Sequence, residues 1–182
     1  MHYMTHDEFT SLTRHIRSPR DRALFLVAFW RGLRASEVGL LTVDSVDLER
    51  GRIQVRRLKG SDSSEYRLHP AEEKALRAWL RVRGRRPGPL FPSRGAVRPI
   101  SRSQLHRLIR RYGAAAGLPV EKLHFHVLKH SIAVYLMDRG ADVADVRDYL
   151  GHRNVQNTMI YAQVTNRRRE EFAKRIYEER RT

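Results

Sequence analysis

Residues 124–131 read HFHVLKHS and place three histidines and one lysine within eight residues, at the start of an apolar run. His126 and His130 are four residues apart, a spacing that helical zinc sites also use. A metalloprotease helix, however, carries a glutamate directly after its first histidine, and the ammonium of Lys129 would repel a divalent cation. On a helix these three side chains share one face near the N-terminus, where the helix dipole favours an anion. The segment therefore predicts a phosphate-binding face and no metal site.

The overall charge also indicates an anionic partner. The chain has 182 residues, and 36 Lys and Arg against 20 Asp and Glu give a net charge of +16. A charge of this size is typical of proteins that bind nucleic acid, and the alternative is a basic protein whose charge serves no ligand. The sequence contains no cysteine, which excludes disulfides and thiolate metal sites.

The sequence shows no membrane or export signal. No segment reaches the ~20 apolar residues that a membrane helix needs, and residues 1–12 lack the charged and apolar regions of a signal peptide. We therefore expect a cytoplasmic protein without a membrane partner.

The elements that must position the reactive residues can be read from the apolar pattern. It predicts a mainly α-helical chain with one small antiparallel β-hairpin, an α+β fold. Thr5 begins a capping-box pattern, and Pro19 suits the first turn of a second helix. Ile53 and Val55 alternate with polar residues, which indicates a strand with one wet face, and Tyr66 lies on the return strand. We expect further helices within 34–41, 70–84, 101–118, 126–140, 141–151 and 166–180, and a short helical or irregular piece at 154–164, all in a single domain spanning 1–182.

Five segments now stand in a characteristic order: GLRASEVGLL, RRLKGSDSSEYRLHP, HFHVLKHSIAVYLMDRG, DYLGHRNVQNTMIY and a charged C-terminal helix. The short motif LGH is weakly specific by itself, but the five together resemble the catalytic domain of the tyrosine recombinases, the phage integrase family. The resemblance runs from about Leu26 to the C-terminus. It implies a site-specific DNA recombinase that binds double-stranded DNA in the nucleoid and needs no cofactor. The catalytic residues that it implies are Arg34, Lys59, His126, Lys129, His152 and Tyr161.

The chemistry of a phosphodiester fits these residue types. Tyr161 would attack the phosphorus and form a covalent 3′-phosphotyrosine, which stores the bond energy for rejoining. Lys59, on the hairpin turn, would protonate the leaving 5′ oxygen. Arg34 would meet the negative charge that develops on the phosphate oxygens with a two-pronged fork, assisted by Lys129 and the two histidines.

Each of these residues also has a simpler interpretation. Arg34 could pair with Glu37 on the next turn, and Lys59 could be an ordinary solvated turn residue. His152 could cap a helix, and Tyr161 could be one of several packing tyrosines.

Lys129 departs from the family pattern, because it stands where an arginine is expected. Lysine keeps the charge but loses the bidentate geometry, and losing one such donor can cost ~3 kcal/mol of transition-state stabilisation. This leaves open a weakly active or non-catalytic DNA-binding protein that retains the fold. A type IB topoisomerase, which shares the chemistry, is a further alternative.

The basic residues near these motifs are the expected DNA contacts, although sequence cannot separate phosphate from base contacts. They are Arg56, Arg57, Arg102, Arg107, Arg110 and Arg111. The resemblance implies a homotetramer on paired sites, with the C-terminal helix at 163–182 exchanged between protomers. The alternative is that this helix folds back onto its own core. Only about 25 residues precede the catalytic segments, so we expect no separate N-terminal core-binding domain, and an accessory DNA-bending or core-binding protein is a further expected partner.

Overall fold

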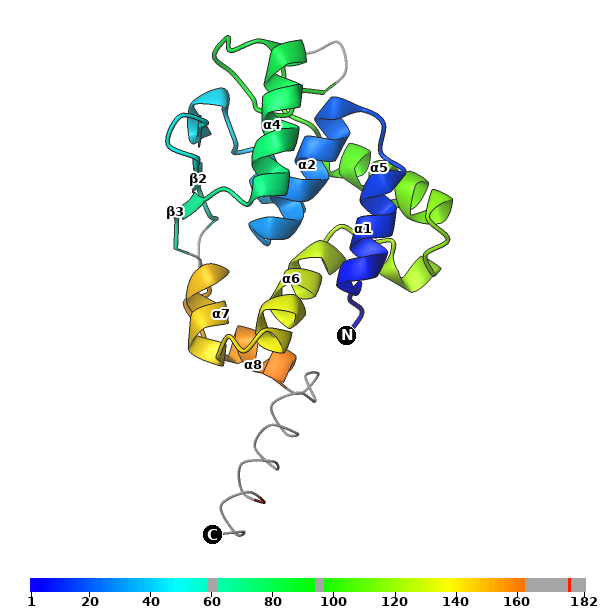
Figure 1. Ribbon diagram of the computed structural model, residues 1–182, viewed down its shortest axis with the longest axis vertical. Helices are drawn as coiled ribbons and strands as arrows, with labels where there is room; N and C mark the ends of the chain where they lie inside the picture. The colour runs from blue at the N-terminus through cyan, green and yellow to red at the C-terminus, as the bar shows by residue number, and fades with distance from the viewer. Residues whose placement is uncertain (59–61, 94–96, 163–176, 178–182) are drawn as a thin grey trace.

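The computed structural model describes residues 1–58, 62–93, 97–162 and 177 (Figure 1). In these residues the fold is mainly helical with a small antiparallel sheet, as the sequence predicts. No described helix is long and apolar enough to cross a membrane. The helices are α1 His6–Arg14, α2 Pro19–Trp30, α3 Ala35–Val38, α4 Pro70–Arg83, α5 Arg102–Ala115, α6 Val127–Asp138, α7 Val143–Tyr149 and α8 Gln156–Ala162. Short 3-10 turns lie at Val43–Ser45 and Val120–Lys122.

The first two helices begin where the sequence predicts. The Thr5 side chain accepts the N–H of Glu8 at 3.2 Å, and the Glu8 carboxylate accepts the N–H of Thr5 at 2.7 Å, so the capping box is present. Ser18 caps α2 ahead of Pro19. Because α2 packs against both α4 and α6, its apolar side chains are buried on nearly every side and form the centre of the core.

The sheet has three antiparallel strands in the order β1 Val46–Asp47, β2 Arg52–Val55 and β3 Ser64–Arg67. In β2 the side chains of Ile53 and Val55 are buried and their neighbours are exposed, as predicted. The sequence did not reveal β1, because a two-residue strand is too short to show an alternating pattern.

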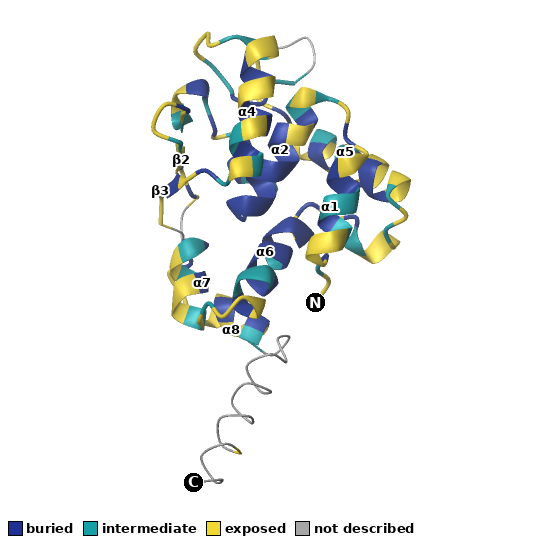
Figure 2. Cartoon of the chain, viewed as in Figure 1, coloured by how far each residue is buried: buried dark blue, intermediate teal, exposed yellow. Residues whose placement is uncertain are grey.

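Helix α6 lies within its predicted range. It packs against α2 on one side and against α7 and α8 on the other, so most of its length is buried (Figure 2). Lys129, on the predicted phosphate-binding face, is itself enclosed, because only 6% of the residue is exposed. The face near the helix start keeps His126 exposed and His130 half-buried.

A close backbone contact joins the β2–β3 hairpin to the link between α7 and α8. The N–H of Asp62 donates to the carbonyl of Gly151 at 2.9 Å, and Arg153 forms an ion pair with the Asp62 carboxylate at 3.0 Å. Gly151 has φ +64°, and a Cβ placed there would lie 2.5 Å from the Asp62 carbonyl oxygen. Glycine is therefore required both for its backbone conformation and for the approach of the hairpin.

Three sequence predictions lie wholly or largely outside the described residues. They are Lys59, the C-terminal helix at 163–182 apart from Tyr177, and the exchange of that helix between protomers.

The contact at Gly151 yields a stability prediction. Gly151→Ala should lower the free energy of unfolding by at least about 2 kcal/mol, because the new Cβ is strained at positive φ and meets backbone that cannot rotate away. Thermal or denaturant unfolding measures this. The matched control is Gly140→Ala, which has φ +94° and no atom within 4 Å of the added Cβ, and so reports the strain without the clash. Equal losses in the two variants would contradict the prediction.

Candidate active site

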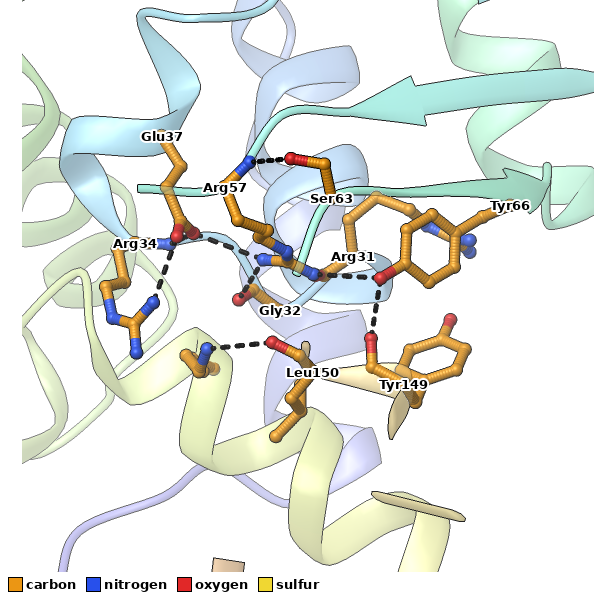
Figure 3. Close-up of polar contacts among 10 residues, drawn as sticks. Arg31, Gly32, Arg34, Glu37, Arg57, Ser63, Tyr66, Tyr149 and Leu150 are labelled. Atoms are coloured by element: carbon orange, nitrogen blue, oxygen red, sulfur yellow. Dashed lines mark hydrogen bonds and ion pairs between the residues drawn. The ribbon is translucent and has the colours of Figure 1, made fainter. Parts of the chain in front are cut away.

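A buried carboxylate, that of Glu37 in α3, organises the first predicted site residue. One of its oxygens accepts the backbone N–H of Arg34 at 2.8 Å, and the other accepts Nη1 of the same arginine at 3.0 Å (Figure 3). The Arg34 side chain retains 40% of its surface exposed. The pairing of Arg34 with Glu37 therefore exists, and it fixes the direction of a guanidinium that an anion can still reach.

Arg57 is the second cation on Glu37, and its placement corrects its assignment as a DNA contact. Its side chain is fully buried, with Nη1 donating to Glu37 at 3.1 Å and to the Gly32 carbonyl at 3.1 Å. Its Nη2 donates to the Arg31 carbonyl at 2.6 Å and lies 3.4 Å from the Tyr66 hydroxyl (Figure 3). A guanidinium enclosed by these acceptors supports the turn that carries Arg34 and does not reach a ligand in this structure.

The charge state of Glu37 follows from these contacts. Burial alone would raise the pKa of its carboxyl group. The hydrogen bond from the Arg34 N–H, together with the charges of Arg57 and Lys129, outweighs burial and lowers the pKa below its usual range. Glu37 is therefore ionised at neutral pH and partly balances the positive charges around it.

Lys129 projects from α6 towards the same cluster. Its Nζ donates to the carbonyl of Leu150 at 3.5 Å, next to Gly151 and His152. Burial, aided by repulsion from Arg34 and Arg57, lowers the pKa of the Lys129 ammonium to about 7. An arginine would remain charged in this place, so the substitution changes the protonation behaviour of the site as well as its geometry.

His152 is held in a neutral form beside these cations. Its Nδ1 lies 3.0 Å from the hydroxyl of Thr158 in α8, and both residues are buried. Burial, followed by the charges of Lys129, Arg34 and Arg57, lowers the pKa of His152 to about 3. An imidazole whose Nδ1 accepts the threonine hydroxyl would carry its proton on Nε2, where it can donate to an oxyanion.

Tyr161 is enclosed, with only 2% of its surface exposed. Its hydroxyl lies 3.0 Å from Nδ1 of His130. Burial raises the pKa of Tyr161 to about 12, although the charge of Arg34 opposes this effect. Burial, His126 and Lys129 lower the pKa of His130 to about 4, so both partners are neutral near pH 7.

His126 stands at the N-cap of α6, at the start of the helix that the sequence predicts. Its ring stacks on His124 with centroids 5.7 Å apart and meets His130 edge-on at 5.4 Å. On the far side His124 lies 5.8 Å from His106 of α5. In the described part of the chain, no group of three or more His, Asp or Glu side chains has the arrangement of a metal site.

The predicted basic contacts on α5 are all exposed, but they fall on two stripes of the helix. Arg102 and Arg110 are spaced by four residues on either side of His106, so they share the stripe that faces His124. Arg107 and Arg111 share the other stripe, which lines a groove of about 390 Å³ with Arg20 of α2. Arg56, on the hairpin, is also exposed.

Two contacts of the site could not be predicted from the sequence: the ion pair between Glu37 and Arg57 and the hydrogen bond between His130 and Tyr161. Glu37 was visible three residues after Arg34, but its second partner Arg57 lies 20 residues further along the chain. The hydrogen bond between His130 and Tyr161 joins residues that are 31 positions apart in the sequence. No local spacing carries such a signal.

The described site combines fixed cations, neutral imidazoles and a protonated phenol. The charges of Arg34 and Lys129 both act on His152, and that of Arg34 also acts on Tyr161, so these side chains share one electrostatic environment. Such an arrangement suits an in-line displacement at phosphorus, where the cations meet the developing charge and the phenol is the nucleophile.

Comparisons with known proteins agree with this chemistry. The model of the phage integrase family matches residues 2–168. The type 1 fimbriae regulatory protein FimE of Escherichia coli K12 is 40% identical over 147 residues, which cover 78% of this chain and 73% of FimE. The crystal structure of XerA recombinase superposes with a TM-score of 0.83 at 29% identity and covers 96% of this chain and 64% of XerA. The XerH site-specific recombinase bound to palindromic difH substrate in a post-cleavage complex gives 0.79 at 26% identity, covering 94% of this chain and 52% of XerH.

The buried ammonium yields a pH prediction. The pKa of Lys129 is about 7 in the folded chain against 10.5 for an unperturbed lysine, so between these values the unfolded chain binds more protons and stability rises with pH. Lys129→Met should stabilise the ligand-free protein at neutral pH. Its advantage over the wild type should shrink by about 2 kcal/mol from about pH 7.5 to about pH 9.5. Denaturant unfolding at several pH values measures this.

The matched control for this measurement is Lys74→Met, which removes an exposed lysine from α4. This variant should follow the wild-type dependence on pH. A constant difference between the wild type and Lys129→Met across the range would show that Lys129 is not the titrating group.

Proposed function

The chain is a tyrosine recombinase of the phage integrase family, and we propose that it breaks and rejoins DNA at specific sites through a covalent 3′-phosphotyrosine at Tyr161. The observation that carries this proposal is geometric: α6, which bears Lys129, packs against α7 and α8, and Lys129 donates to the carbonyl of Leu150, two residues before His152. The charge of Arg34 acts on both His152 and Tyr161. The chain spans 73% of the length of FimE and 64% of that of XerA.

The described residues have distinct roles in this reaction. Arg34, oriented by Glu37, donates to the non-bridging oxygens of the scissile phosphate. Lys129 supplies a second positive charge, and the Nε2–H of His152 a neutral donor. His126, exposed at the head of α6, donates to the phosphate or positions it. Lys59 lies outside the described residues, and its role as the acid that protonates the 5′ oxygen stays a prediction.

Binding of DNA should change the protonation of Lys129. A phosphate dianion or diester beside a buried ammonium stabilises the charged form, which raises the pKa of Lys129 from about 7. The lysine therefore becomes fully charged when the substrate is present. A charged Lys129 in the substrate complex is consistent with a catalytic role, although lysine lacks the bidentate geometry of the arginine expected at this position.

We also propose how the protein binds DNA and assembles on it. Exposed cations on the hairpin and on α5 support binding to duplex DNA, and XerH is a relative of the same fold in complex with its DNA substrate. We propose a homotetramer on paired sites, with the segment at 163–182 exchanged between protomers, and an accessory DNA-bending or core-binding protein.

A trapping experiment tests the proposed activity. End-labelled duplexes with randomised sequence and a nick in one strand release the short fragment that carries the new 5′ hydroxyl. The other fragment stays bound to the tyrosine through its 3′ phosphate, so the covalent adduct accumulates and is resolved on a denaturing gel. The wild type should form an adduct that maps to Tyr161. Tyr161→Phe should form none while it retains DNA affinity, and Lys129→Arg should reach at least the wild-type yield, since it restores a bidentate donor.

The same experiment separates the alternatives. An adduct in Lys129→Arg but not in the wild type would identify a DNA-binding protein that has lost its activity. Relaxation of supercoiled DNA that lacks the selected site would favour a topoisomerase.

The two stripes on α5 yield a prediction about DNA contacts. The double variant Arg102→Ala/Arg110→Ala should weaken DNA binding and reduce the slope of log affinity against log salt by roughly 2, since about one unit is lost for each phosphate contact. The matched double variant Arg107→Ala/Arg111→Ala removes the same charge from the stripe that faces Arg20 and should keep a slope nearer the wild type. Fluorescence anisotropy over a salt series measures both, and equal slopes would contradict the prediction.

A further inference from the structure

His130 contacts the atom that would react, and the proposed function leaves this contact unused. Its Nδ1 lies 3.0 Å from the hydroxyl oxygen of Tyr161. We propose that His130 is a catalytic residue that accepts the proton of Tyr161 as the phenol attacks phosphorus and returns it when the DNA strand is rejoined. This inference rests on the proposed function and names the base for its first step.

Burial makes a side-chain acceptor necessary. Tyr161 is enclosed between α8 and α6, which pack against each other, and only 2% of its surface is exposed. Bulk water therefore has little access to the phenolic proton in this position. His130 is half-buried on the facing side of α6 and reaches the hydroxyl directly.

The other two histidines of the site are placed differently. Nδ1 of His152 is engaged by Thr158, three residues before Tyr161 on α8, so each hydroxyl on this face has its own imidazole partner. His126 is exposed and meets the edge of the His130 ring, with the two ring centroids 5.4 Å apart. Among the described residues, His130 is thus the basic group with a hydrogen bond to the Tyr161 hydroxyl.

The proton balance of the step is complete. The O–H bond of Tyr161 breaks, its electron pair forms the bond to phosphorus, and its proton moves to Nδ1 of His130. The bond from phosphorus to the 5′ oxygen breaks, and that oxygen takes a proton from a separate acid, for which Lys59 is the expected residue. On rejoining, the imidazolium returns its proton to the departing phenol.

The surrounding charges confine this transfer to the DNA-bound state. Burial lowers the pKa of the His130 imidazole to about 4, and electrostatic repulsion from His126, Lys129 and the N-terminal amine of Met1 adds to this effect. The pKa of Tyr161 is about 12, so without DNA the proton stays on the phenol. A phosphate beside Lys129 and Arg34 offsets these charges, and attack on phosphorus makes the phenol a strong acid.

The decisive variant is His130→Asn, because the asparagine side chain keeps a polar atom near the position of Nδ1 but has no basicity in this range. In the trapping experiment it should form the Tyr161 adduct on the order of 100-fold more slowly than the wild type, with unchanged melting temperature and DNA affinity. The matched control is His124→Asn, which changes an exposed histidine whose ring stacks on that of His126. This variant should form the adduct at a rate within about twofold of the wild type. A wild-type rate in His130→Asn would overturn the proposal.

A second measurement tests the contact without relying on activity. Nitrogen NMR of the ring of His130 should show the neutral tautomer with its proton on Nε2 and Nδ1 as acceptor, and Tyr161→Phe should shift the Nδ1 signal. A proton on Nδ1, which could not accept from the phenol, would overturn the inference even if the protein proves active. If the wild type forms no adduct while the predicted tautomer is present, the proposed recombinase activity fails and the contact between the two residues stands.

Discussion

The ionised carboxylate of Glu37 is the interaction on which the site depends. It is buried under α3 and accepts hydrogen bonds from Arg34 and Arg57, while Lys129 lies within range of its charge. Without this carboxylate the positive groups would face one another in a poorly solvated interior, at a cost of several kcal/mol for each buried charge. Glu37 therefore allows the chain to hold cations together before any anionic substrate arrives.

The positive charge around Glu37 is only partly neutralised, because the described cations outnumber the carboxylate that they share. Burial is the main cause of the lowered pKa values of Lys129, His130 and His152, and nearby positive charges add to it in each case. In the reaction that we propose, the entering phosphate supplies the missing negative charge and relieves this repulsion. The same excess of positive charge would then serve both recognition of the substrate and preparation of the catalytic groups.

Packing of the helices fixes the positions of these charged groups. Helix α6 is clamped between α2 and the pair α7 and α8, so Lys129 and His130 have fixed neighbours on both sides. The contact of Asp62 with Gly151 attaches the hairpin to the segment that carries His152. The hydroxyl of Tyr66 donates to the carbonyl of Tyr149 at 2.8 Å and adds a second tie between the sheet and α7. These contacts bring residues from distant parts of the chain to one place.

The sequence by itself determined the features that depend on neighbours along the chain. The capping box at Thr5, the alternation in β2 and the motif order that names the family are all local patterns, and most helices lie where those patterns predict. Only the tertiary structure decided that Arg57 is a buried support, that Lys129 is enclosed and titrates near neutral pH, and that His130 holds the Tyr161 hydroxyl. The reason is physical, because burial and electrostatic interaction depend on groups that are distant in sequence, and the same residue letter serves equally for an exposed or an enclosed side chain.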